Sequence, residues 1–163
     1  MTDRVALLYR LRARDAATIC DAIEVPQSSR GFAGFASRTM HRTGVRDARI
    51  MGHARAARIA GAAPPDEPVE AMRARRDYFR SMAAGPHPRI AAIEDMDGDG
   101  AVGAWWGEVH ARIHAEVFGL VGAVTNDVVR DLPTLPPSAL ASSAPIKTSS
   151  TSARSAPPPR PPA

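Results

Sequence analysis

The acidic residues of this chain stop at Asp131, and proline becomes frequent immediately after it. All 17 Asp and Glu residues lie at or before Asp131, whereas residues 133–163 hold nine of the 15 prolines, seven serines and no aromatic residue. A segment of this composition buries too little apolar surface to offset the entropy that it loses on ordering. We therefore expect one folded domain over residues 1–137 and a disordered tail, rich in Pro, Ser and Ala, over residues 138–163.

The same boundary accounts for the net charge. The 163-residue chain has a formal charge of +4, and an excess of positive charge can indicate a nucleic-acid partner. Residues 1–132 carry 18 Arg against 17 acidic residues, and the remaining cations, Lys147, Arg154 and Arg160, lie in the tail. Because the domain itself is close to neutral, we expect no direct binding of nucleic acid.

The sequence also bounds the cellular setting. Arg10, Arg12 and Arg14 interrupt the apolar run at the N-terminus, and no stretch approaches the roughly 20 apolar residues of a membrane span. Cys20 is the only cysteine, so the chain cannot form an internal disulfide. We expect a cytoplasmic protein without membrane contact.

Hydrophobic periodicity predicts an α/β domain with a central β-sheet. Apolar residues recur at helical spacing in two N-terminal stretches, and Asp15 is placed to cap the second of them. Short apolar runs bounded by Gly or Pro indicate strands. The expected helices lie within residues 3–23 (two short helices), 67–83 and 105–118, and the expected strands lie at 50–59, 89–94 and 120–125.

An arginine cluster on the third expected helix has two interpretations. Arg73, Arg76 and Arg80 gather on one face and could hold a phosphate group. The alternative is a solvated helix face that Glu70 and Asp77 partly balance. We favour the second interpretation.

Two further patterns match metal sites incompletely. The run Asp95–Gly100 matches the opening of a calcium-binding EF-hand loop, but Trp106 stands where that loop needs a bidentate carboxylate. We interpret it as a loop at the carboxyl end of a strand, where ligands bind in α/β folds. His110 and His114 are four residues apart and could face one metal, but Ala111 stands where zinc hydrolases place Glu. Surface or capped histidines are the favoured interpretation of this pair.

The most specific pattern combines two elements. Gly103–Glu108 predicts a turn that opens a helix, whose free N–H groups can receive a carboxylate. After the next strand, Arg130 offers a cation for a carboxylate or enolate oxygen, and Asp131 offers a ligand for a hard divalent metal. A small keto acid and its metal would need such a set. Taken alone, the Arg-Asp pair is also explained by a helix cap with a salt bridge.

These residues carry a family resemblance. The run from Gly103 to Leu132, with Gly-Ala-Trp-Trp-Gly-Glu-Val at its start and Val-Arg-Asp-Leu at its end, resembles the RraA-like family. This family contains regulators of ribonuclease activity and metal-dependent 4-hydroxy-4-methyl-2-oxoglutarate aldolases, some of which decarboxylate oxaloacetate. The resemblance covers about residues 12–137 and includes the upstream segments 17–23, 52–57 and 89–93.

The resemblance implies a layered α/β domain that assembles as a homotrimer or higher oligomer. It also implies Mg²⁺ or Mn²⁺ held by Asp131, with Glu108 and Arg130 as catalytic residues. The backbone N–H groups of Val109 and His110 would bind the substrate carboxylate, while Arg130 would bind the keto or enolate oxygen and Glu108 would order water at the metal. The implied substrate-binding residues are Gly107, Glu108, Val109, His110 and Arg130.

The function that follows is a divalent-metal-dependent lyase. It would cleave small 2-keto acids such as 4-hydroxy-4-methyl-2-oxoglutarate or oxaloacetate to give pyruvate, and the metal and Arg130 would stabilise the charge of the enolate. The alternative is a non-catalytic binding protein that modulates a ribonuclease or another enzyme.

Three features differ from the family pattern. Asp127 stands where the family usually has Gly, and one additional residue lies near residues 116–118. The resemblance also ends near Pro137, where relatives continue. Twenty Arg against one Lys indicate a GC-rich coding sequence, so we expect a truncated or frameshifted C-terminus in which the tail replaces part of the domain. A chain that does not fold stably is a third alternative.

Overall fold

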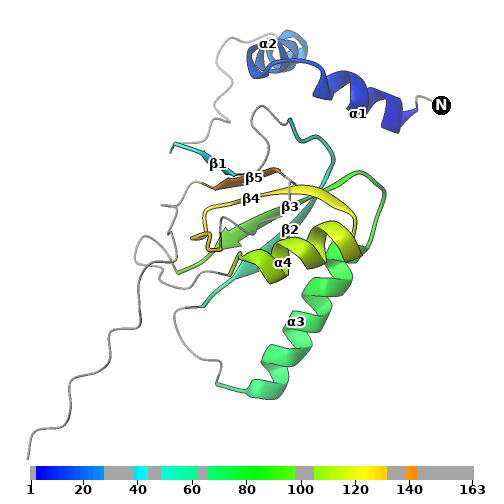
Figure 1. Cartoon of the computed structure of the whole chain (residues 1–163). Helices are drawn as coiled ribbons and strands as arrows, with labels where there is room; N and C mark the ends of the chain where they lie inside the picture. The colour runs from blue at the N-terminus through cyan, green and yellow to red at the C-terminus, as the bar shows by residue number, and fades with distance from the viewer. Residues whose placement is uncertain are drawn as a thin grey trace, which may run out of the picture.

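The protein has a mixed α/β fold built on a five-stranded sheet (Figure 1). The structure, a computed structural model, describes residues 3–27, 39–43, 49–61, 66–97, 105–131 and 139–142. The sheet order is β1-β5-β4-β3-β2, in which β2 to β5 run parallel and β1 pairs antiparallel with β5. The strands are β1 (His41–Thr43), β2 (His53–Ile59), β3 (Arg89–Asp95), β4 (Leu120–Thr125) and β5 (Ala139–Ser142).

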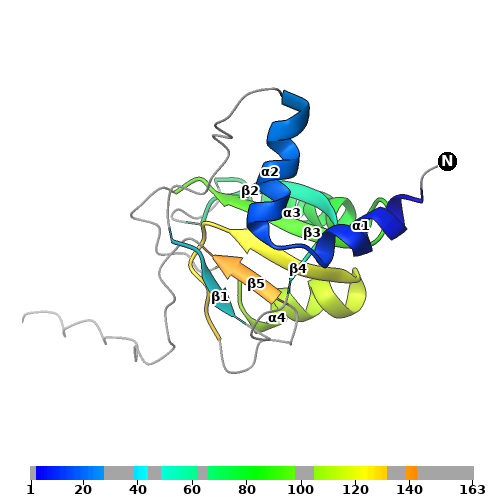
Figure 2. The ribbon, with the colours of Figure 1, turned by 90° about the horizontal axis from the view of Figure 1, so that it is seen from above.

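The helices lie on both sides of this sheet (Figures 1 and 2). Parallel neighbours need a crossover connection, and α3 supplies it between β2 and β3, as α4 and the π-helix η2 do between β3 and β4. These crossover helices share one face, while α1 and α2 lie on the other side. The bounds are α1 (Arg4–Arg12), α2 (Ala16–Gln27), α3 (Pro68–Ala83), α4 (Glu108–Arg112) and η2 (Ile113–Val117).

The core lies between the sheet and the crossover helices. Alternate residues of β3 point into it, so Ala91 and Ile93 are buried while Glu94 is exposed. Because both crossover helices cover this face, burial is concentrated here. The buried apolar cluster comprises Met82, Ala91, Ile93, Trp106, Ala111, Leu120, Ala123 and Val129.

Arg89 is buried at the amino end of β3, with only 4% of its surface exposed. Its guanidinium donates to the backbone oxygens of Ala83 and Phe118, which end α3 and follow η2, and it lies 2.8 Å from Nε2 of His87. A cation at helix C-termini is favourable because the carbonyl groups there carry partial negative charge. Arg89 therefore joins both crossover helices to the sheet.

Most of the predicted elements are confirmed. Strand β4 spans the predicted residues, and Asp15 caps α2 by accepting a hydrogen bond of 2.8 Å from the backbone N–H of Thr18. The strand expected at 50–59 begins at His53. The helix expected at 105–118 begins at Glu108, because Trp106 instead runs extended and forms a bridge with Val129.

The additional residue expected near residues 116–118 coincides with a π-helical turn. In η2 the backbone N–H of Phe118 donates to the oxygen of Ile113 at 3.0 Å, a spacing of five residues. A π-turn holds one residue more than the α-helical turn it replaces.

The C-terminal expectation needs a correction. Disorder was predicted from residue 138, but Ala139–Ser142 form β5, which pairs in parallel with β4. These four residues contain no proline, so each can donate to the hydrogen-bond ladder, and the average composition of the tail conceals this. Residues 132–138 and 143–163 lie outside the described residues.

No helix in the described ranges is both long and apolar enough to cross a bilayer.

Candidate functional site

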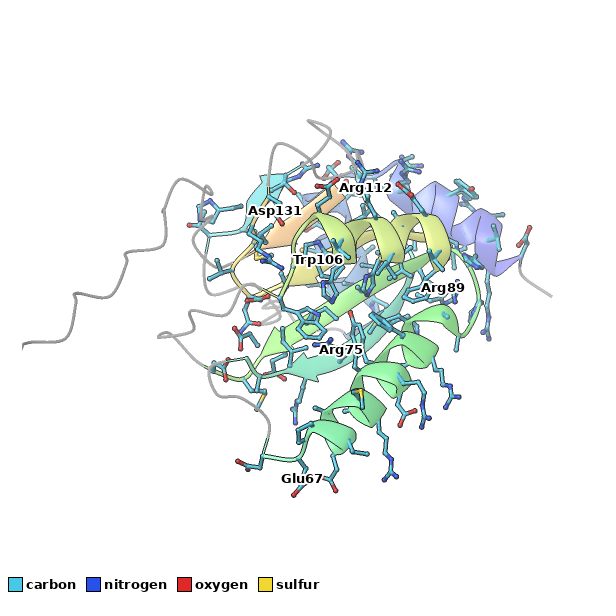
Figure 3. The ribbon with its side chains drawn as sticks, turned by 60° about the horizontal axis from the view of Figure 1, so that its bottom comes forward. Glu67, Arg75, Arg89, Trp106, Arg112 and Asp131 are labelled. Atoms are coloured by element: carbon cyan, nitrogen blue, oxygen red, sulfur yellow. The ribbon has the colours of Figure 1, made fainter. Side chains whose placement is uncertain are left out.

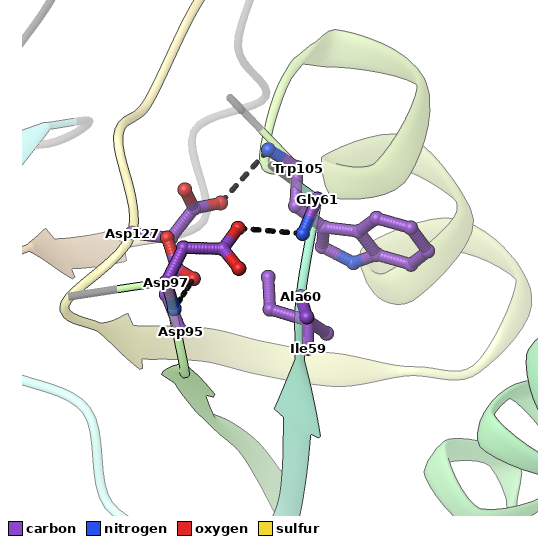
Figure 4. A pocket seen from close by; sticks show the side chains of 7 residues that line it. All are labelled: Ile59, Ala60, Gly61, Asp95, Asp97, Trp105 and Asp127. Atoms are coloured by element: carbon purple, nitrogen blue, oxygen red, sulfur yellow. Dashed lines mark hydrogen bonds between the residues drawn. The ribbon is translucent and has the colours of Figure 1, made fainter. Parts of the chain in front are cut away.

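The carboxyl ends of three parallel strands enclose a cavity of about 200 Å³ (Figure 4). Ile59 ends β2, Asp95 ends β3, and Asp127 follows β4. In open parallel sheets the loops at this edge are the usual place for ligands. The lining residues are Ile59, Ala60, Gly61, Asp95, Asp97, Trp105 and Asp127.

Asp127 anchors the segment that leads into α4. It is only 2% exposed, and its Oδ2 accepts hydrogen bonds from the backbone N–H groups of Trp105 at 2.8 Å and Trp106 at 3.2 Å. Burial raises the pKa of Asp127 to about 6, although these hydrogen bonds oppose the shift. The carboxyl group of Asp127 thus holds the backbone of Trp105 and Trp106 in place.

The other carboxylates of the cavity are bonded to backbone. Asp95 Oδ1 accepts from the N–H of Asp97 at 2.9 Å, and Asp97 Oδ2 accepts from the N–H of Gly61 at 2.6 Å. Asn126 exchanges two hydrogen bonds with the backbone of Asp95, of 2.6 and 3.0 Å. These contacts close the loop after β3 against β2 and β4. Residues 98–100 of the calcium-like pattern lie outside the described residues.

A second cluster forms where Gly107 meets the residues that follow β4. A Cβ atom on Gly107 would lie 2.6 Å from Asp131 Oδ2 and 2.9 Å from Arg130 Nε, so no larger residue fits without displacing both side chains. The backbone N–H of Arg130 donates to the oxygen of Trp106 at 3.0 Å. Two sequence segments that were predicted to share a site are therefore in direct contact.

The charged groups of this cluster face solvent. The Arg130 side chain is 55% exposed and the Asp131 side chain 38%, with Arg130 Nε 3.7 Å from Asp131 Oδ2. Asp131 also accepts a long contact of 3.4 Å from the backbone N–H of Glu108. Figure 3 shows Asp131 beside the start of α4. Glu108 turns its carboxylate along the helix to Arg112, at 2.9 Å.

The first turn of α4 offers backbone donors. Its hydrogen bonding begins with the N–H of Ala111, which donates to the oxygen of Gly107 at 3.0 Å, so the preceding N–H groups have no acceptor within the helix. Val109 is exposed here. The His110 ring lies 4.6 Å from the Trp105 ring, and burial, followed by the positive charges of Arg75 and Arg130, lowers the pKa of His110.

His114 is part of the core rather than of a metal site. Its Nδ1 lies 2.6 Å from the backbone oxygen of His110, and its Nε2 lies 2.6 Å from the hydroxyl of Tyr78. The ring is therefore neutral, with Nδ1 as donor and Nε2 as acceptor, and burial lowers its pKa to about 4. This confirms the interpretation of His114 as a capped histidine.

Few side chains that could bind a metal lie close together in the described residues. Within the described ranges, no three or more His, Cys, Asp or Glu side chains gather closely enough to hold an ion. Asp131, whose side chain is partly exposed beside Arg130, is the carboxylate of this cluster that the resemblance assigns to the metal. That arrangement fits a hydrated Mg²⁺ or Mn²⁺, which keeps several waters and takes one or two carboxylates, and it does not fit zinc.

Comparisons with known proteins identify no relative. No protein-family model, no curated protein and no solved structure matches this chain. The RraA-like resemblance therefore stays a prediction, and the geometry around Gly107 and Arg130 is the basis for a functional proposal.

Proposed function

We propose that the protein is a divalent-metal-dependent lyase that cleaves small 2-keto acids, such as 4-hydroxy-4-methyl-2-oxoglutarate or oxaloacetate, to give pyruvate. The observation that carries this proposal is the packing of Gly107 against Arg130 and Asp131. It brings a guanidinium, a solvent-accessible carboxylate and the N–H groups of a helix start to one place. The resemblance to the RraA-like family supplies the reaction class.

The substrate carboxylate is assigned to the helix start. The N–H groups of Val109 and His110 precede the first donor used within α4, so they are available to an anion. Lowering of the pKa of His110 keeps its ring neutral, so it adds no charge of its own there. Gly107 allows Asp131 and Arg130 to pack directly against this helix start, because a side chain at position 107 would collide with both.

Cleavage leaves negative charge that the protein must stabilise. Loss of the proton from the C4 hydroxyl breaks the C3–C4 bond of the aldol substrate, one pyruvate departs, and the bonding electrons form the enolate of the second. In oxaloacetate the departing group is CO₂. Arg130 is assigned the binding of the enolate oxygen, and the exposure of its side chain, 55%, supports this role. Asp131 would hold a magnesium ion, which when bound would add to the stabilisation of this charge.

Glu108 is assigned the proton transfer. Its carboxylate is held by Arg112 at 2.9 Å, which fixes its orientation. The residue starts α4 directly beside Asp131. The proton that Glu108 accepts from the C4 hydroxyl is then returned to the enolate carbon, and after decarboxylation of oxaloacetate water supplies this proton instead; either step releases pyruvate.

The test is pyruvate release measured with a coupled dehydrogenase, with and without Mg²⁺. We expect magnesium-dependent turnover in the wild type and a loss of about 100-fold or more in Arg130→Ala and in Asp131→Ala. Arg12→Ala, an exposed arginine on α1, serves as the matched control and should turn over normally. A folded wild type that releases no pyruvate with either substrate would contradict the proposal and favour a non-catalytic binding protein.

A further inference from the structure

The outer side of α3 carries a hollow of about 560 Å³ that the proposed lyase does not use. We name it the α3 groove. Its floor is apolar, formed by Met72 and Phe79 of α3 and by Phe118 after η2, and its edges carry Arg75, Arg76 and Arg80. The rings of Phe79 and Phe118 lie 5.7 Å apart and close the groove toward the core. Met72 is 67% exposed although it is a large apolar residue.

Helical spacing explains why cations line both edges. Met72 and Phe79 are seven residues apart, so they fall on one stripe, and Ala83 extends it by one further turn. Arg75 lies on the side of this stripe toward the core, and Arg76 and Arg80 lie four residues apart on the other side. An apolar stripe with charge along both edges is the pattern of a surface that pairs with another amphipathic helix.

The arginines retain positive charge for a partner. Asp77 is shared by Arg76 at 3.5 Å and Arg80 at 3.4 Å, and both contacts are solvent-exposed and therefore weak. Arg75 pairs with no carboxylate of the described residues, and its guanidinium lies over the Trp105 ring, 5.5 Å from the centroid. That ring contact holds one cation in place before binding, which lowers the entropy lost when a partner arrives.

We propose that the α3 groove binds an acidic amphipathic helix of a partner protein. Charge complementarity requires acidic residues opposite Arg75 and opposite Arg76 and Arg80, and the apolar floor requires apolar side chains between them. The stripe from Met72 to Ala83 is about 16 Å long, or three helical turns. Such a groove accepts anchors at positions i, i+4 and i+7 of a helix.

Nucleic acid fits this surface less well. Its phosphates would use the arginines but would leave Met72 and Phe79 without apolar contact. The near-neutral charge of residues 1–132 also gives little of the extended positive field that nucleic acids require.

The test uses two synthetic peptides of about 14 residues, a length at which isolated helices become marginally stable. Both carry Leu at i, i+4 and i+7; one has Glu on its flanks, and the other has Gln at the same positions. Binding is followed by fluorescence anisotropy. We expect the Glu peptide to bind wild type about tenfold more tightly than the Gln peptide, because each exposed ion pair contributes roughly two- to fivefold.

Substitutions in the groove separate charge from apolar contact. The variant with Arg75→Gln, Arg76→Gln and Arg80→Gln should bind both peptides equally. Without the arginines, the glutamates of the peptide have no opposite charge to pair with. Met72→Gln should weaken both peptides severalfold, and because Met72 is exposed its loss should not unfold the domain. Arg12→Gln on α1 removes one charge far from the groove and should change neither affinity.

Three outcomes would overturn the proposal. They are no saturable binding of the Glu peptide, binding that the groove substitutions leave unchanged, and tighter binding of poly(U) than of the Glu peptide at near-physiological salt. None of these measurements depends on lyase turnover, so the two proposals can fail independently.

Discussion

Replacement of Asp127 by Asn should change how stability depends on pH. The native pKa of Asp127 is raised to about 6 from 3.8. The folded protein therefore holds this proton more tightly than the unfolded chain, and the stability that results is fully present below pH 3.8 and is lost as the pH rises toward 6. A shift of about two pKa units corresponds to about 3 kcal/mol of unfolding free energy.

His114 acts in the opposite direction over the same range. Burial lowers its pKa to about 4 from 6.5, so the unfolded chain takes up a proton first as the solution is acidified. Its contribution is complete above pH 6.5 and is lost as the pH falls to 4, again by about 3 kcal/mol. In the wild type the pH dependences that Asp127 and His114 give to the unfolding free energy nearly cancel.

In the Asp127→Asn variant, the pH dependence of the unfolding free energy that comes from His114 should no longer be cancelled. The amide oxygen can still accept from the N–H groups of Trp105 and Trp106, so the loop contact is kept. We expect the variant to be more stable than wild type at pH 7 and to lose about 3 kcal/mol, relative to wild type, between pH 7 and pH 4.

The assay is urea unfolding followed by tryptophan fluorescence. The chain has two tryptophans, Trp105 and Trp106, and the backbone N–H groups of both donate to Asp127. Linear extrapolation gives the unfolding free energy at each pH. Asp66→Asn, at an exposed position before α3, is the matched control and should follow wild type. A difference between Asp127→Asn and wild type that stays constant from pH 4 to pH 7 would refute the assigned pKa shift.

Gly107→Ala should reduce magnesium-dependent pyruvate release at least tenfold in steady-state assays. The new Cβ atom would lie only 2.6 Å from Asp131 Oδ2 and would push that carboxylate away. Unchanged turnover would show that the contact has no role. Arg89→Met should lower the unfolding free energy by about 2–4 kcal/mol, measured with urea, since two backbone oxygens lose a charged donor. A loss below 0.5 kcal/mol would contradict the conclusion that Arg89 joins α3 and η2 to the sheet. Tyr78→Phe should cost about 1 kcal/mol in the same assay and raise the pKa of His114 little, as followed by NMR titration, because burial is the main cause of that shift.

Local patterns in the sequence predicted the elements well because each depends on neighbouring residues. The short apolar runs at 89–94 and 120–125 and the cap at Asp15 all act within a few residues, and the structure confirms the two strands and the cap. The proximity of Gly107 to Arg130 was predicted from the chemistry that the two segments could share and from the family resemblance, since more than twenty residues separate them in the chain.

The contacts that sequence reasoning missed are all long-range and involve polar groups. An aspartate after a strand gives no sign that it will accept from the N–H groups of Trp105 and Trp106, twenty or more residues away. The buried pair of Tyr78 and His114 depends on how α3 packs against η2.

The order of the sheet has a consequence for synthesis of the protein. β1 is the first strand to leave the ribosome, yet the only described strand that pairs with it is β5, the last. β1 must therefore wait, without a described sheet partner, until residue 142 has been made. Closing the sheet through contacts between residues 41–43 and 140–142 spans nearly the whole domain, and contacts at such separation slow folding. A chain arrested before β5 would carry its N-terminal segment as an undocked arm during translation.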